Sequence, residues 1–405
     1  MAAAFWGSNT KRARCIRRRS REFDVDFDPT QEQCAALDGW ARFVDRDLVP
    51  VVQPFNDQAF TPEVAHRLMA MMSPYGVGCG WLPEDSGGAG LDFLTSGLLF
   101  EALALRSPDA AGLAWVAEGA ALKVYANGSD EIKRRYLPGM LLGKVIGCSA
   151  ISEPGMGSSV REMRTRAVRD GKNFRITGEK TWCSNATVAD VMIVMAKTDE
   201  KEFSMFLIDR REHGFESREI NKLGLNGWPL GQVLLDDVVV PEENLLGKLG
   251  SGMRETMKGF NRSRCFVSTL ALGIARAALD EAIQYAQQRS QFGKPIAGHQ
   301  LVQAMLAQMA TDLAASQLLV YRALAMMAQG KPCELEASIA KSFATEAAQR
   351  VASTAIQVFG AAGITKDLSI ERHFRNARML TIPDGTTQIN QLIIGRKLTG
   401  IDAFS

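Results

Sequence analysis

The sequence predicts an α+β protein in which a helical segment, a strand-rich segment and a second helical segment follow one another. Before about residue 145, apolar residues recur every three or four positions, as in "TSGLLFEALALRS". Short runs rich in β-branched and aromatic residues then follow, such as "NFRITGEKTWC" and "VMIVMAKT". Long alanine-rich blocks with helical spacing return after about residue 251. The expected parts are residues 27–145, 146–250 and 251–405.

Residues 1–26 differ from the rest of the chain in charge. Seven of the eleven residues at 11–21, "KRARCIRRRSR", are basic, and no acid precedes Glu22. The remaining chain holds 40 basic against 45 acidic residues, so the overall net charge of +2 hides an acidic body. The basic segment at residues 1–26 resembles an organelle transit peptide. We expect it instead to be a disordered tail, or to result from a start codon placed too early.

The three structural parts each have recognisable features. In the first, "PEDSGGAGLD" (83–92) separates two helices; no strand precedes it and no GxGxxG completes it, so we expect a structural loop. The middle part has turn signals at short intervals, which is typical of a small β-barrel or sandwich. The last part has long amphipathic blocks joined by short breaks such as "GKPCE", which predicts a helical bundle.

Composition argues against several classes of function. The seven cysteines form no CxxC pair, and the four histidines lie too far apart for a metal-ligand spacing, so no metal is expected. There is no GxSxG nucleophile motif. No apolar run approaches the ~20 residues of a membrane span, and the basic tail lacks the interleaved aromatics of a nucleic-acid surface. We expect a cytoplasmic protein.

The chain resembles the acyl-CoA dehydrogenase family over about 375 residues, and seven motifs in the family's order carry this resemblance. They are "PEDSGGAGLDFLTSGLLFEALA", "ISEPGMGSSV", "GEKTWCSNA", "DDVVVPEENLLG", "RSQFGKPIAGHQ", "QVFGAAG" and "IPDGTTQI". The resemblance implies FAD bound between a middle β domain and a C-terminal four-helix bundle, in a homotetramer or homodimer. It also implies removal of two hydrogens from the α and β carbons of an acyl thioester.

The same resemblance implies the site residues. Those implied for FAD are Ile151, Ser152, Gly157, Ser158, Trp182, Ser184, Arg289, Phe292, Gln357, Gly360, Thr386 and Gln388. Those implied for the substrate are Ser158, Arg264 and Gly385. In the family, residues matching Arg289 and Phe292 reach the FAD of a neighbouring subunit. A salt bridge inside the bundle is the alternative role for Arg264.

Asp384 matches the family's catalytic base, although the usual residue there is glutamate. The aspartate shortens the reach of the carboxylate by about 1–1.5 Å. The carboxylate would remove the α-proton of the thioester as hydride moves to the flavin. The alternative is a turn or N-cap residue, because Asp-Gly-Thr-Thr precedes the helical "QINQLIIGRKL".

These inferences predict FAD-dependent α,β-dehydrogenation of an acyl group carried on CoA or on an acyl carrier protein. The reduced flavin would pass its electrons to an electron-transfer flavoprotein or to oxygen. Departures from the family pattern, among them Asp384, Pro383 and Ala361, favour specialised metabolism over fatty-acid oxidation. The alternatives are a flavin monooxygenase that hydroxylates nitrogen or sulfur, and a non-catalytic binding protein with this fold.

Overall fold

The computed structural model describes residues 29–403, so the predicted basic tail, residues 1–26, lies outside the described residues. The N-terminal part is helical, and several of its helices begin at a side-chain cap. Thr30 and Gln33 form a capping box, and Asp92 accepts from the backbone N–H groups of Leu94 and Thr95. The main helices are α2 (Gln31–Phe43), α4 (Pro62–Met72), α5 (Phe93–Ala104), α6 (Pro108–Asn127) and α7 (Asp130–Leu141).

The middle part forms a mixed sheet of eight strands. Their order is β6-β7-β3-β2-β4-β5-β8, and β1 pairs with β4 in parallel. The strands are β1 (Gly147–Ala150), β2 (Arg166–Asp170), β3 (Asn173–Ser184), β4 (Val191–Lys197), β5 (Phe203–Asp209), β6 (Glu216–Glu219), β7 (Leu230–Pro241) and β8 (Leu245–Leu246). The long strands β3 and β7 pair antiparallel.

Strands β4 and β5 are buried on both faces, which explains their nearly continuous apolar sequence. One face, including Met192 and Phe206, packs against residues of β3 and β7. The other face, including Ile193 and Leu207, packs against α6 and α7. The sheet is therefore joined to the N-terminal helices by an apolar layer.

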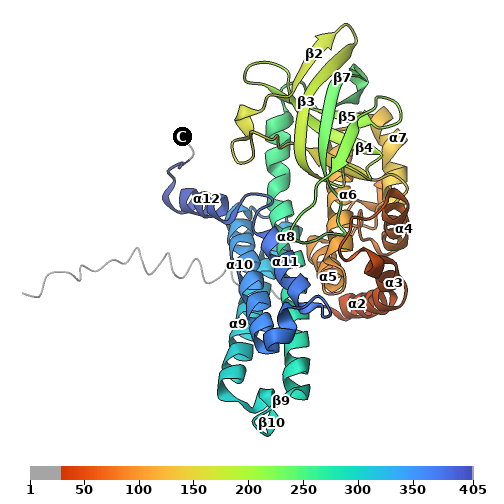
Figure 1. Cartoon of the computed structure of the whole chain (residues 1–405). Coiled ribbons are helices and arrows are strands. Elements are labelled where there is room, and N and C mark those ends of the chain that lie inside the picture. The colour runs from red at the N-terminus through yellow and green to blue at the C-terminus, as the bar shows by residue number, and fades with distance from the viewer. Residues whose placement is uncertain (1–28, 404–405) are drawn as a thin grey trace, which may run out of the picture.

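The C-terminal part is a bundle of long helices (Figure 1). They are α8 (Gly252–Gln288), α9 (Gln300–Ala328), α10 (Glu334–Phe359), α11 (Ile370–Leu380) and α12 (Thr387–Thr399). A short hairpin, β9 (Ser290–Gln291) with β10 (Lys294–Pro295), follows α8. Figure 1 shows this hairpin at one end of the bundle and α12 toward the other.

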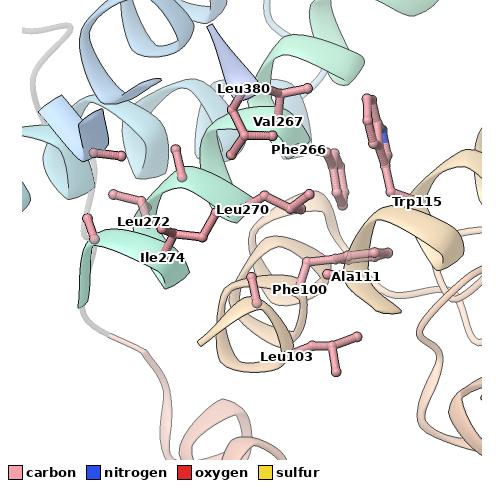
Figure 2. Packing of buried hydrophobic residues seen from close by; sticks show 14 of the residues in the cluster. Phe100, Leu103, Ala111, Trp115, Phe266, Val267, Leu270, Leu272, Ile274 and Leu380 are labelled. Carbon is pink, nitrogen blue, oxygen red and sulfur yellow. The ribbon is translucent and has the colours of Figure 1, made fainter. Parts of the chain in front are cut away.

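The largest core joins the bundle to the N-terminal helices. Figure 2 shows Phe100 and Ala111 facing Phe266 and Leu270 of α8. The rings of Phe100 and Phe266 meet edge to face, with centroids 5.0 Å apart. This shared core fixes α6 against α8, and both helices carry residues of the candidate site.

The fold class predicted from the sequence is confirmed, because a helical part, a sheet and a helical bundle follow in that order. Within residues 29–403, no helix has both the length and the apolar character needed to cross a bilayer.

We expect Phe100→Ala to lower the free energy of unfolding by ~3–5 kcal/mol, because it leaves a cavity in a fully packed core. Val168→Ala on the exposed face of β2 is the control and should change stability by less than ~0.5 kcal/mol. Denaturant titration measures both. Equal stability of the two variants would contradict the assigned core.

Candidate active site

Asp384 lies in the loop between α11 and α12 and has a left-handed backbone, with φ of 55°. Asp384 as a whole is half-buried. Its carboxylate atom Oδ2, however, is shielded from solvent and has no hydrogen-bond partner. The helix cap is made by Thr386, whose hydroxyl accepts from Ile389 N–H at 3.3 Å. The N-cap of α12 is therefore Thr386, and the carboxylate of Asp384 is left for another use.

Lys341 of α10 holds this loop at two points. Its Nζ donates to the carbonyl oxygens of Thr381 at 2.9 Å and Gly385 at 2.8 Å. Lys341 is fully buried, and burial lowers its pKa to about 8 while the charge of Asp384 acts to raise it. Asn390 also donates to the Gly385 carbonyl, at 2.8 Å. The conformation around Asp384 is thus fixed from two helices.

The carboxylate of Asp384 faces α8 and α6 as well as α10. Burial raises its pKa above the ordinary value. A hydrogen bond with Ser263 and the charges of Lys341, Arg264 and Lys123 oppose this rise without cancelling it. A buried carboxyl with a raised pKa is a better proton acceptor than an exposed aspartate.

Arg264 and Lys123 connect Asp384 to the rest of the molecule. Arg264 is buried; its Nη1 donates to Asn261 at 2.9 Å, and its Nε has no partner. Lys123 of α6 donates to the hydroxyl of Ser149 in β1 at 2.8 Å. Because β1 leads directly into residues 151–158, this bond brings the predicted flavin loop to the neighbourhood of Asp384.

A buried ion pair shapes the loop at residues 151–158. Lys180 of β3 donates to the carbonyl of Ile151 and to the carboxylate of Glu153, each at 3.0 Å. Burial alone would raise the pKa of Glu153, but hydrogen bonds from Thr165 and the N–H of Arg164 hold it below its ordinary value. The Thr181 N–H donates to the Ser152 carbonyl at 3.0 Å, so this loop and β3 lie side by side.

Several residues predicted to hold the flavin are accessible along this edge. Trp182 is 61% exposed, although its neighbour Cys183 is buried in the sheet. Ser152 and Ser184 are half-buried. Gly157 and Ser158 are exposed, and a Cβ on Gly157 would meet no atom within 4 Å.

Backbone strain coincides with the predicted residues. Six non-glycine residues of the described chain have a positive φ, and Trp182, Phe292 and Asp384 are three of them. Strain of this kind costs about 1–3 kcal/mol for each residue and gathers at ligand sites. An exposed, strained aromatic beside two serine hydroxyls, near an unpartnered buried carboxylate, fits a flavin ring. Ile151, Ser152, Trp182 and Ser184 would hold that ring.

The remaining predicted residues fall into a separate group. Arg289, Gln357 and Gly360 are exposed, and Phe292 is 94% exposed. The stacked rings of Tyr285 and Phe359, 4.1 Å apart, bring the ends of α8 and α10 that carry this group together. Along α8, roughly 38 Å separates Arg264 from Arg289. Within one chain, the two groups therefore do not form one site. Thr386, Gly385 and the exposed Gln388 stay with the Asp384 group.

Sequence reasoning missed four charged residues around Asp384. Lys341, Lys123, Glu118 and Arg262 are all buried or half-buried. Three of them interrupt alanine-rich apolar helices, in "EASIAKSFA" and "AWVAEGAALKVYA". An isolated charge within an apolar stretch of helix was the available signal, because a buried charge requires a partner or a ligand. Across residues 29–403, no cluster of histidine, cysteine and acidic residues suited to a metal ion is found.

Comparison with known proteins decides the family. Residues 30–144, 148–238 and 250–399 match the N-terminal, middle and C-terminal domains of acyl-CoA dehydrogenases, respectively. The chain belongs to the acyl-CoA dehydrogenase family. It is 34% identical over 363 residues to a 3-(aryl)acrylate reductase of Clostridium sporogenes. The alignment covers 88% of this chain and 95% of that relative.

Solved structures agree with this membership. A structure of the electron-transferring flavoprotein of Acidaminococcus fermentans contains a chain that matches with a TM-score of 0.88 and 32% identity, covering 93% of this chain and 100% of the other. PigA with FAD and proline matches with a TM-score of 0.85 and 28% identity, covering 92% and 99% of the two chains. As an acyl-CoA dehydrogenase family member, this protein is an oxidoreductase whose cofactor is FAD.

We expect Lys341→Met to lower kcat by ~100-fold, because a loop displaced by about 1 Å misplaces Asp384. KM for the thioester should rise far less, since the Lys341 ammonium is bonded to the loop carbonyls. The Thr381 carbonyl would lose its donor and the Gly385 carbonyl would keep only Asn390, so the free energy of unfolding should also fall by about 1–3 kcal/mol. Steady-state kinetics and denaturant titration measure these effects.

Lys331→Met, at an exposed turn after α9, is the matched control and should leave both quantities unchanged. A Lys341→Met enzyme with unaltered kcat would show that this lysine does not position the loop.

Proposed function

We propose that this protein dehydrogenates an acyl-CoA thioester between its α and β carbons, with Asp384 as the base. The observation that carries the proposal is the carboxylate Oδ2, which is buried, unpartnered and held on a strained loop by Lys341. The rise in the pKa of Asp384, caused by burial, supports its use as a proton acceptor. Bound FAD would supply a hydride acceptor for the β carbon.

The residues around Asp384 provide the rest of the catalytic environment. Oδ2 would receive the α-proton, and the backbone N–H of Asp384 would donate to the thioester oxygen as negative charge develops there. Ser263 would stabilise the ionised carboxylate through its hydrogen bond. Ser158 and Gly385 would contact the thioester arm. The shorter reach of aspartate requires the α carbon to lie closer to the loop than glutamate would.

We further propose a homodimer or homotetramer in which Arg289, Phe292, Gln357 and Gly360 hold the FAD of a partner subunit. The strained and exposed Phe292 supports this arrangement, because its ring contacts little of its own chain. An arginine fork suits two phosphate oxygens. Thr386 and Gln388 would contact the FAD of their own subunit, on the side of Asp384.

The electron acceptor and the thioester carrier also belong to the proposal. The match to a chain in an electron-transferring flavoprotein structure favours such a flavoprotein over oxygen. Family membership favours CoA over an acyl carrier protein. We also propose that the protein acts in the cytoplasm and in a specialised metabolic pathway.

Anaerobic titration of the purified flavoprotein with acyl-CoA thioesters tests the function. We expect a suitable thioester to bleach the flavin, and Asp384→Asn to slow bleaching by at least ~10³-fold while the flavin stays bound. Asp367→Asn, an exposed aspartate that precedes α11, is the control. Product formed only with NAD(P)H and oxygen would instead support the monooxygenase alternative and contradict dehydrogenation.

The pH dependence of bleaching tests the role of Ser263. Bleaching should accelerate as pH rises through the raised pKa of Asp384, because only the ionised form takes a proton. Ser263→Ala removes a hydrogen bond that lowers this pKa, so the acidic limb of the profile should move to higher pH. Ser268→Ala, whose hydroxyl donates to the Arg264 carbonyl, should leave the limb in place. A shift to lower pH in Ser263→Ala would contradict the assignment.

A further inference from the structure

A second group of buried charges lies beside Asp384 and has no place in the chemistry described above. Glu118 of α6 is fully buried, and neither of its carboxylate oxygens has a hydrogen-bond partner. Arg262 of α8 is 9% exposed, and its Nε and Nη1 also lack partners. The two side chains, here called the Glu118–Arg262 pair, lie close enough for their charges to act on each other, and no hydrogen bond joins them.

The two charges nevertheless act on one another. Burial raises the pKa of Glu118 to about 7, and the charge of Arg262 works against that rise. Burial lowers the pKa of Arg262, which the charges of Glu118 and Asp384 oppose. Leaving such groups dry and unbonded costs several kcal/mol for each ion. The chain itself supplies no bond that offsets this cost.

The surroundings of the pair are aromatic on one side and include a glycine on another. The Arg262 guanidinium lies 5.2 Å from the ring centroid of Trp81 and 5.7 Å from that of Phe266. The indole Nε1 of Trp81 is buried and also has no partner. Next to Glu118 stands Gly119, where a Cβ would come within 3.4 Å of Arg262 Nη2. A glycine here leaves the guanidinium room.

The pair adjoins the catalytic loop. Arg262 precedes Ser263, which hydrogen-bonds Asp384, and the charge of Asp384 acts on both Arg262 and Lys123. Lys123 lies one helical turn and a half beyond Glu118 on α6. An acyl chain whose α carbon meets Asp384 would therefore have the Glu118–Arg262 pair within its reach.

We infer that the Glu118–Arg262 pair binds a hydroxyl group carried by the acyl chain. This inference rests on the proposed function, since it assumes that the acyl group lies beside Asp384. The hydroxyl donates its hydrogen to the Glu118 carboxylate and accepts from the Arg262 guanidinium, so one group satisfies both orphaned side chains. The rings of Trp81 and Phe266 cover the carbon atoms next to it.

Other acyl ends fit these residues less well. A carboxylate would be attracted by the charge of Arg262 but repelled by that of Glu118. An ammonium group would be attracted by Glu118 but repelled by Arg262. A plain alkyl chain would expel water and leave both charges without hydrogen bonds. Sites built to bond a hydroxyl reject the analogue without it by large factors, because their polar groups are then left unpaired.

The experiment compares matched acyl-CoA thioesters that differ only in a terminal hydroxyl, over a range of chain lengths. Anaerobic flavin bleaching by the holoenzyme gives kcat/KM for each. At the chain length that reaches the pair, we expect the hydroxyacyl thioester to exceed its plain counterpart by at least ~100-fold. Calorimetry on the Asp384→Asn holoenzyme should show the same order in binding affinity without turnover.

Variants assign the preference to these residues. Glu118→Leu combined with Arg262→Leu removes both charges together, which buried pairs often tolerate without loss of stability. This double variant should keep its flavin and lose most of the preference, with faster reaction of the plain thioester. Glu118→Gln retains an acceptor for the hydroxyl and should keep most of the preference. Asp170→Asn, an exposed acid on β2, is the control.

Three results would overturn the inference. They are a plain thioester that reacts and binds as well as its hydroxylated counterpart at every length, an ω-carboxyl thioester that surpasses both, and a preference that survives in the double variant. The first of these, with bleaching intact, leaves dehydrogenation standing. If no thioester bleaches the flavin, the proposed function fails, and the calorimetric comparison still decides what the pair binds.

Discussion

The buried ammonium group of Lys341 is the interaction on which the active-site loop depends. It bonds the carbonyls of Thr381 and Gly385, which lie on either side of Asp384. Through these bonds a rigid helix of the bundle sets the position of a short carboxylate on a strained backbone. An aspartate has less freedom than a glutamate to search for its substrate, so a fixed loop matters more here.

Helix α8 ties the parts of the site together. Its Ser263 meets Asp384, its Arg262 lies beside Glu118 of α6, and its far end carries Arg289. The apolar contact between Phe100 and Phe266 keeps α5 and its neighbours against this helix. Packing of the N-terminal helices therefore decides how close the charges of α6 come to the loop. This coupling joins the stability of the core to the chemistry of the site.

Much of the fold could be predicted from the sequence, because its periodicities are strong. The alternation in β3 and the long apolar spacing in α8, α9 and α10 are local patterns, and the structure has them. The residues around Asp384 are harder to predict from the sequence. The sequence pattern does not single out Ser263, Lys341 or Glu118, because their importance comes from contacts between helices distant in sequence. The proximity of α6, α8 and α10 is a tertiary fact that no local pattern contains. Likewise, the hydrogen bond from the Ile389 N–H to the Thr386 hydroxyl, which the sequence does not show, is what makes Thr386 the cap of α12.

The most direct test of the account is exchange of the α-hydrogen of a bound acyl-CoA analogue that cannot lose hydride from its β carbon. In deuterated buffer, nuclear magnetic resonance follows the replacement of that hydrogen. The wild-type holoenzyme should exchange it, and Asp384→Asn with bound FAD should not. Equal exchange by the two proteins would contradict the assignment of Asp384 as the base.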